Sequence, residues 1–105
     1  MRTDAFTKTE RRKLRELAGL AYERELSEAL RELATDFAAW KGKSINAFDL
    51  SDSIHEFHNG VARDLWSLYN QLKPPMIVAG ALERGVLTSK DVPAPLRAKL
   101  NAPAV

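Results

Sequence analysis

The sequence predicts an all-α fold: a small helical bundle built on a long N-terminal helix that runs antiparallel to a second helix. Two long stretches, residues 9–40 and 50–72, carry apolar residues at helical spacing. A short third helix and a terminal helical turn are expected to follow. The chain has 105 residues, of which 45% are hydrophobic, so we expect one helical domain covering residues 1–105.

The first helix is predicted to begin at Thr7 or Thr9 and to continue to Trp40. Thr7 is followed three residues later by Glu10, which is the spacing of a capping box. Gly42 is expected to take the left-handed position that ends many helices. At 1.5 Å per residue this helix is roughly 50 Å long, whereas a compact domain of this size is only ~26 Å across. The helix must therefore bend or project.

Two apolar stripes lie about half a turn apart around this predicted helix. One core cannot bury both, so either the helix kinks near Gly19 or its N-terminal half packs on a partner. We favour the partner, and a second copy of the chain is the most economical one. The C-terminal stripe contains Tyr22, Leu26, Ala29, Leu30, Leu33, Phe37 and Trp40, and the N-terminal stripe, which is the predicted interaction surface, contains Phe6, Leu14, Leu17 and Leu20.

Residues 44–50 are predicted to connect the first two helices and to fold back over the core through Ile45 and Phe48. Asp49 or Ser51 can cap the second helix. Apolar residues then recur at intervals of three and four as far as Leu72. The Asn-Gly pair at 59–60 favours a turn, but the apolar spacing passes through it without a slip, so we expect one helix that is at most bent there.

The third element, residues 74–87, starts with a proline that the first helical turn tolerates and has Gly85 at its C-terminal end. A last turn or two of helix is expected within residues 95–100. The two closely spaced prolines of this segment, Pro93 and Pro95, oppose its assignment as the DNA-recognition helix of a helix-turn-helix.

The two histidines lie on the second predicted helix, where Asp52, His55 and His58 could form a metal or acid–base site. The His-Glu-Phe-His order lacks the four-residue separation of the zinc-binding HExxH motif. We therefore favour an ordinary helix surface, with His58 hydrogen-bonded at the edge of the core and His55 beside Trp66. A small-molecule cleft near His55, Trp66 and Tyr69 is left open.

Charge alternates in blocks along the chain, although the net charge is only +2. Residues 1–15 carry six basic and two acidic groups, and residues 16–40 carry two basic and six acidic groups. A row of cations at intervals of three and four residues forms a basic ridge that could contact nucleic acid phosphates or an acidic protein. The basic ridge consists of Lys8, Arg11, Arg12 and Arg15.

Composition excludes several classes of protein. The chain has no cysteine, which rules out disulfides, thiolate metal sites and cysteine nucleophiles and favours a reducing compartment. No apolar run approaches the roughly 20 residues of a membrane-spanning helix. We expect a cytoplasmic, non-enzymatic protein without a cofactor. It is interpreted as a protein–protein interaction or regulatory module acting as a homodimer, with nucleic-acid binding as the first alternative and a histidine metal site as the second.

Overall fold

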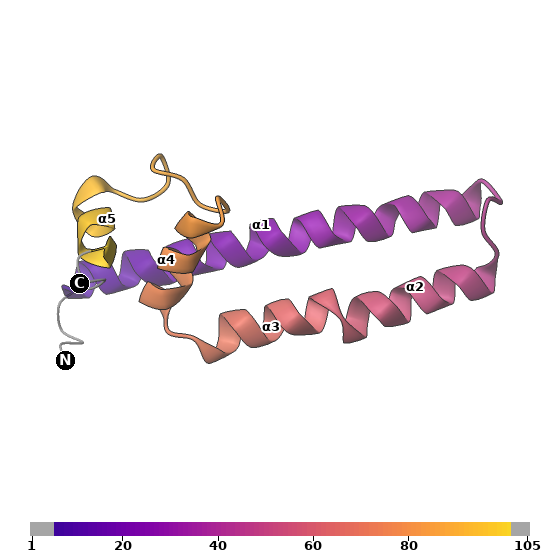
Figure 1. The fold of residues 1–105 in the computed structure, drawn as a ribbon, viewed down its shortest axis with the longest axis horizontal. Helices are drawn as coiled ribbons and strands as arrows, with labels where there is room; N and C mark the ends of the chain where they lie inside the picture. The colour runs from indigo at the N-terminus through magenta and orange to yellow at the C-terminus, as the bar shows by residue number, and fades with distance from the viewer. Residues whose placement is uncertain (1–5, 102–105) are drawn as a thin grey trace.

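A computed structural model describes residues 6–101, which form five helices and no strand (Figure 1), confirming the all-α prediction. The described chain measures 54 × 25 × 24 Å and has a radius of gyration of 17.7 Å. A compact domain of about a hundred residues has a radius near 13 Å, so this molecule is elongated. The helices are α1 (Lys8–Lys41), α2 (Ala47–Asn59), α3 (Val61–Gln71), α4 (Pro74–Glu83) and α5 (Ala94–Asn101).

Helix α1 is continuous and sets the length of the molecule. It begins with the predicted capping box, in which the Glu10 backbone N–H donates to the Thr7 hydroxyl at 3.1 Å and the Thr7 N–H donates to the Glu10 carboxylate at 2.8 Å. Gly19 lies inside the helix without a break. The predicted cap at Gly42 needs a correction, because Gly42 has φ −81° and the left-handed position falls to Lys43, with φ 66°.

Two leucines of the N-terminal stripe of α1 are buried inside the same chain, whereas Leu20 of that stripe is 37% exposed. Leu14 and Leu17 are 1% and 3% exposed, and they form the hydrophobic core with residues of α4, α5 and the loop between these two helices. These leucines are therefore not available to a second copy, which corrects the predicted interaction surface. We call residues 6–24 and 72–100 the head. Its core consists of Leu14, Leu17, Ala21, Val78, Ala81, Leu87, Val92 and Leu96.

The C-terminal half of α1 forms a long antiparallel hairpin with α2 and α3, and it extends well away from α4 and α5 (Figure 1). We call residues 25–71 the arm. Within the arm only Ala29, Leu50 and Leu65 are buried. Periodicity predicted a bend in α1 or a partner for it, whereas the head covers Leu14 and Leu17 of one stripe and the returning helices cover only part of the other.

The predicted second helix is two helices, α2 and α3, with a break at Gly60. The Gly60 backbone has φ −105° and ψ −101°, and a Cβ atom at this position would lie 2.7 Å from the carbonyl oxygen of Glu56. A residue with a side chain would clash with that backbone oxygen. The Asn-Gly pair thus interrupts the helix, although the apolar residues continue in register on both sides.

The start of α2 also differs from the prediction. Asn46 is the N-cap, and its side chain accepts from the Asp49 N–H at 2.8 Å while the Asp49 carboxylate accepts from the Asn46 N–H at 3.1 Å. Asp49 therefore completes a capping box rather than acting as the cap. Phe48 does not fold over the core, because it is 82% exposed on the first turn of α2.

The last two helices follow the predicted pattern closely. Helix α4 begins at Pro74, and Gly85 adopts the left-handed conformation just after its C-terminus, with φ 78°. Helix α5 covers the predicted terminal turn and buries Leu96 in the head.

Candidate interaction surface

The arm exposes far more apolar side chain than the head does. Trp66 is 58% exposed and Leu30 is 45% exposed, and both line one groove of the arm. Two helices in contact bury one strip each, and the side chains beside that strip stay open to solvent. The exposed large apolar residues of the arm are Leu30, Phe37, Trp40, Phe48, Ile54, Val61 and Trp66.

One side of the arm carries an apolar groove of about 530 Å³ between α1 and the junction of α2 with α3. Arg63 is the one formally charged residue among those that line it. Helical spacing extends this side with Phe37, seven residues after Leu30, and with Ile54, three residues before Phe57. We call this surface the Leu30 face, made of Leu26, Leu30, Phe37, Ile54, Phe57, Ala62 and Trp66.

The heptad positions of α1 explain why this face is open. Leu26 and Leu33 occupy a positions and Ala29 a d position, of which Ala29 is buried, whereas the next d position is Asp36. Leu30 and Phe37 follow at e positions. A helix that is apolar at a and d serves one neighbour, whereas apolar a, d and e positions are typical of a helix inside a larger bundle. The arm thus has the pattern of a bundle helix but lacks the neighbour.

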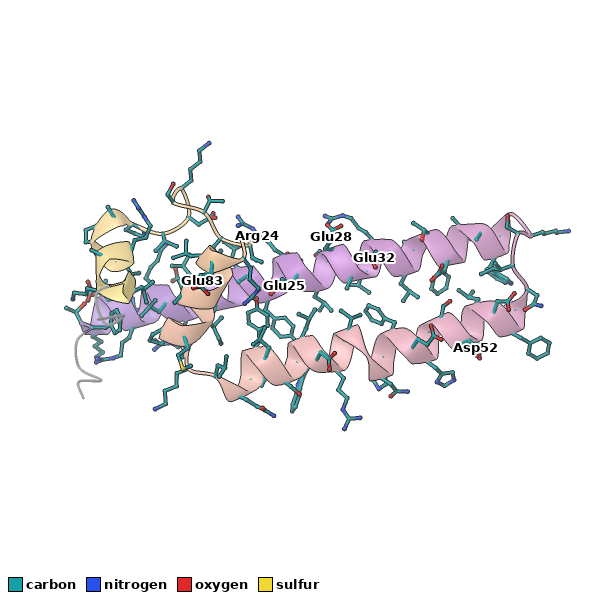
Figure 2. All side chains as sticks on the ribbon, in the orientation of Figure 1. Arg24, Glu25, Glu28, Glu32, Asp52 and Glu83 are labelled. Atoms are coloured by element: carbon teal, nitrogen blue, oxygen red, sulfur yellow. The ribbon has the colours of Figure 1, made fainter. Side chains whose placement is uncertain are left out.

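The opposite side of the arm is acidic. Glu25, Glu28 and Glu32 follow one another along α1 (Figure 2) and line a shallow hollow of about 510 Å³ with Val61 and Leu65. Helical spacing places further carboxylates on the same side of the arm, so like charges would meet if two copies approached through it. These further carboxylates are Asp36, Asp49, Glu56 and Asp64.

Several contacts join the arm to the head where it leaves the head. Tyr22 of α1 and Tyr69 of α3 stack with ring centroids 4.7 Å apart and planes 3° from parallel. The Tyr69 hydroxyl donates to the Glu25 carboxylate, which also accepts from Arg84 of the α4 C-terminus at 2.8 Å. Burial and the hydrogen bond to Glu25 raise the pKa of the Tyr69 hydroxyl above its ordinary value of 10.0. These contacts fix the orientation of α3 and so of the Leu30 face.

The basic ridge lies on the head, near the N-terminus of α1. All four of its side chains are exposed, and the Arg11 guanidinium donates to the Phe6 carbonyl oxygen at 2.7 Å. Residues 6–24 and 72–100 together carry eleven basic and five acidic groups, whereas residues 25–71 carry four basic and eight acidic groups. The head is therefore positively charged and the arm negatively charged.

The structure does not gather the histidines into a metal site. Asp52, His55 and His58 are all exposed on α2, and no three His, Cys, Asp or Glu residues between positions 6 and 101 lie close enough to hold a metal ion. Asp52 lies on the part of α2 near the free end of the arm (Figure 2). His58, rather than His55, lines the Leu30 groove together with Trp66. It is exposed instead of lying at the core edge.

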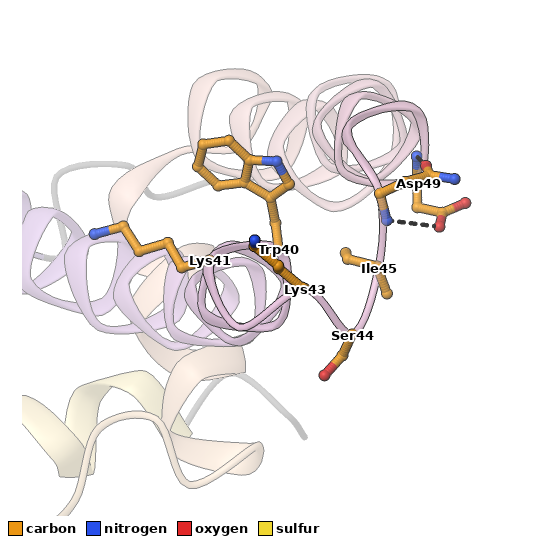
Figure 3. A pocket seen from close by; sticks show the side chains of 7 residues that line it. Trp40, Lys41, Lys43, Ser44, Ile45 and Asp49 are labelled. Atoms are coloured by element: carbon orange, nitrogen blue, oxygen red, sulfur yellow. Dashed lines mark hydrogen bonds between the residues drawn. The ribbon is translucent and has the colours of Figure 1, made fainter.

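A second hollow lies at the free end of the arm, where Trp40, Lys41 and Lys43 surround the loop that leads into α2 (Figure 3). Two polar groups of this hollow, on Asn46 and Asp49, are already used in the α2 capping box. We therefore attribute the hollow to the shape of the turn.

No helix within the described chain combines the length and hydropathy needed to cross a bilayer. Comparison with protein-family models, with curated protein sequences and with solved structures found no match to this chain.

Proposed function

We propose that this protein is a non-enzymatic protein–protein interaction module that works as a homodimer, with the Leu30 face as the contacting surface. The observation that carries the proposal is the half-exposed apolar seam of the arm, where Leu30 and Trp66 flank a groove nearly free of charge. Apolar patches of this kind on a folded protein mark interaction sites. The lack of cysteine fits a cytoplasmic location for the module.

Burial supplies the driving force. Covering a large apolar side chain that is exposed to water contributes on the order of 1.5–3 kcal/mol when the covering is complete. Leu30, Phe37, Ile54 and Trp66 are between 39% and 58% exposed, so each of them gains part of that amount in a complex. The head holds the arm in place, so little ordering accompanies binding.

Sedimentation equilibrium of the full chain tests this proposal. We expect the wild type to reach the mass of a dimer and Trp66→Glu to remain a monomer, because the substitution places a charge in the apolar contact. Met76→Glu is the matched control, since Met76 is 60% exposed on the head and lies outside the Leu30 face. A wild-type monomer at the highest attainable concentration contradicts the proposal, as does a Trp66→Glu variant that dimerises normally.

A second candidate function, nucleic-acid binding, is favoured by the exposed basic ridge on a head with excess positive charge. When a protein binds phosphates through cations, its affinity for nucleic acid falls steeply as the salt concentration rises. Arg12→Ala and Arg15→Ala should each reduce the slope of log affinity against log salt by about 1, as measured by fluorescence anisotropy with a labelled duplex. If the protein does not bind the labelled duplex at low salt, nucleic-acid binding is excluded.

A further inference from the structure

We propose that two copies of this chain pack antiparallel through their Leu30 faces, so that the two arms form one helical bundle and the two positively charged heads lie at its opposite ends. This inference rests on the proposed function and adds the occupant of the face and its orientation.

A second arm supplies what the heptad pattern of α1 lacks. Leu30 and Phe37, at e positions, are 45% and 39% exposed, and a neighbouring helix beyond α2 and α3 would cover them. Four-helix bundles are built from helices of matched length, and two identical hairpins supply them in pairs. Ser27 and Ala34 stand beside Leu30 and Phe37 on α1, and such small side chains let a partner helix approach closely.

The face is large enough for a stable dimer. The part of α1 in the arm is roughly 25 Å long, and two helices spaced ~10 Å apart make a face about 20 Å wide. Two such faces in contact bury on the order of 1,000–1,200 Å², which reaches the lower limit for specific interfaces. A narrower partner, such as a single helix, would leave part of the face exposed.

Charge decides both the face and the orientation. Two copies cannot stack through their acidic sides, where Glu25, Glu28 and Glu32 would meet the same residues of the partner. The groove of the Leu30 face is lined by one formally charged residue, Arg63, so far less like charge meets there. A parallel dimer would place the two heads, each with eleven basic and five acidic groups, side by side, whereas the antiparallel dimer keeps them at opposite ends of the bundle.

A spin label at a single engineered cysteine measures the orientation, because the chain has no cysteine of its own. Ser44 is exposed at the free end of the arm, so Ser44→Cys places one label at each tip. In the antiparallel dimer the tips lie at opposite ends of the bundle, and pulsed electron resonance should give a label separation of roughly 30 Å or more. In a parallel dimer the two labels should be within about 20 Å. Dilution with unlabelled wild type should abolish the signal.

Salt provides the second measurement. The dissociation constant of the antiparallel dimer should change by less than about threefold between about 0.05 M and 0.5 M NaCl, because the two positively charged heads are separated by more than the screening length. A parallel dimer should tighten with salt. A dimer with short label distances, or one strengthened by salt, overturns the antiparallel inference but leaves the interaction module standing. A chain that stays monomeric overturns both.

Discussion

Arg24 and Asp91 form a two-point ion pair across 67 residues of sequence, with nitrogen to oxygen distances of 2.9 and 3.0 Å. The same guanidinium donates to the Val86 carbonyl oxygen at 2.9 Å. Asp91 also accepts from the Thr88 backbone N–H at 2.8 Å. The pair therefore ties the loop between α4 and α5 to the middle of α1 and closes the head at the point where the arm begins.

Arg24→Ala should destabilise the protein, because it removes both bonds to Asp91 and leaves the Val86 carbonyl without its side-chain donor. We expect the thermal midpoint to fall by a few degrees. Arg31→Ala is the matched control, since its pair with Glu28 is about 70% exposed at both ends and such pairs contribute little. Equal midpoints for the two variants would contradict the structural role of Arg24.

The stabilising effect of Asp91 should depend on pH. The hydrogen bonds from Arg24 and from the Thr88 backbone hold the pKa of the Asp91 carboxyl well below its ordinary value of 3.8. A depressed pKa stabilises the fold above the unfolded-state pKa, and this stability is lost as the pH falls toward the folded-state pKa. The free energy of unfolding of wild type minus that of Asp91→Asn should be constant above about pH 5 and should narrow below about pH 4. A difference that widens in acid is incompatible with this pair.

Two leucines on α1 should respond very differently to truncation. Leu14 is 1% exposed in the head core, so Leu14→Ala should lower the free energy of unfolding by roughly 2–5 kcal/mol. Leu20 is 37% exposed, and Leu20→Ala should cost less than about 1 kcal/mol. Urea denaturation of both variants measures the difference. Similar costs for the two variants would contradict the burial of Leu14 in the head core.

Two glycines should likewise show opposite effects when changed to alanine. Gly60→Ala brings a Cβ atom against the Glu56 carbonyl oxygen at the break between α2 and α3, so it should destabilise the arm by about 1 kcal/mol or more. Gly19→Ala meets nothing within 4 Å inside the continuous helix α1 and should stabilise by roughly 0.5–1 kcal/mol. Chemical denaturation tests both, and a stabilised Gly60→Ala variant would rule out the break.

Local chemistry made much of the fold predictable from the sequence. The capping box of Thr7 and Glu10, the proline start of α4 and the left-handed Gly85 each depend on a few neighbouring residues. The break at Gly60 could not be predicted from periodicity. The apolar residues keep the same helical spacing on both sides of it, so their pattern does not reveal a local change of backbone direction.

The candidate surface was harder to predict, because exposure depends on how many helices cover a stripe. Leu14 and Leu30 both belong to apolar stripes of α1, yet Leu14 is covered by the C-terminal third of the chain and Leu30 is half open. The burial of Leu14 depends on packing against residues more than sixty positions later in the chain, such as Val78 and Leu96. The e-position spacing of Leu30 and Phe37 was the one signal in the sequence that pointed to the surface.

Fluorescence quenching of Trp66 tests most directly whether a second chain covers the Leu30 face. In a Trp40→Phe background Trp66 is the one remaining tryptophan, so its quenching by acrylamide reports the exposure of that face alone. The Leu30-face dimer predicts that Trp66 is shielded at high protein concentration and becomes accessible on dilution, with the same midpoint as dissociation of the dimer. Trp66 that is equally accessible at every concentration would contradict it.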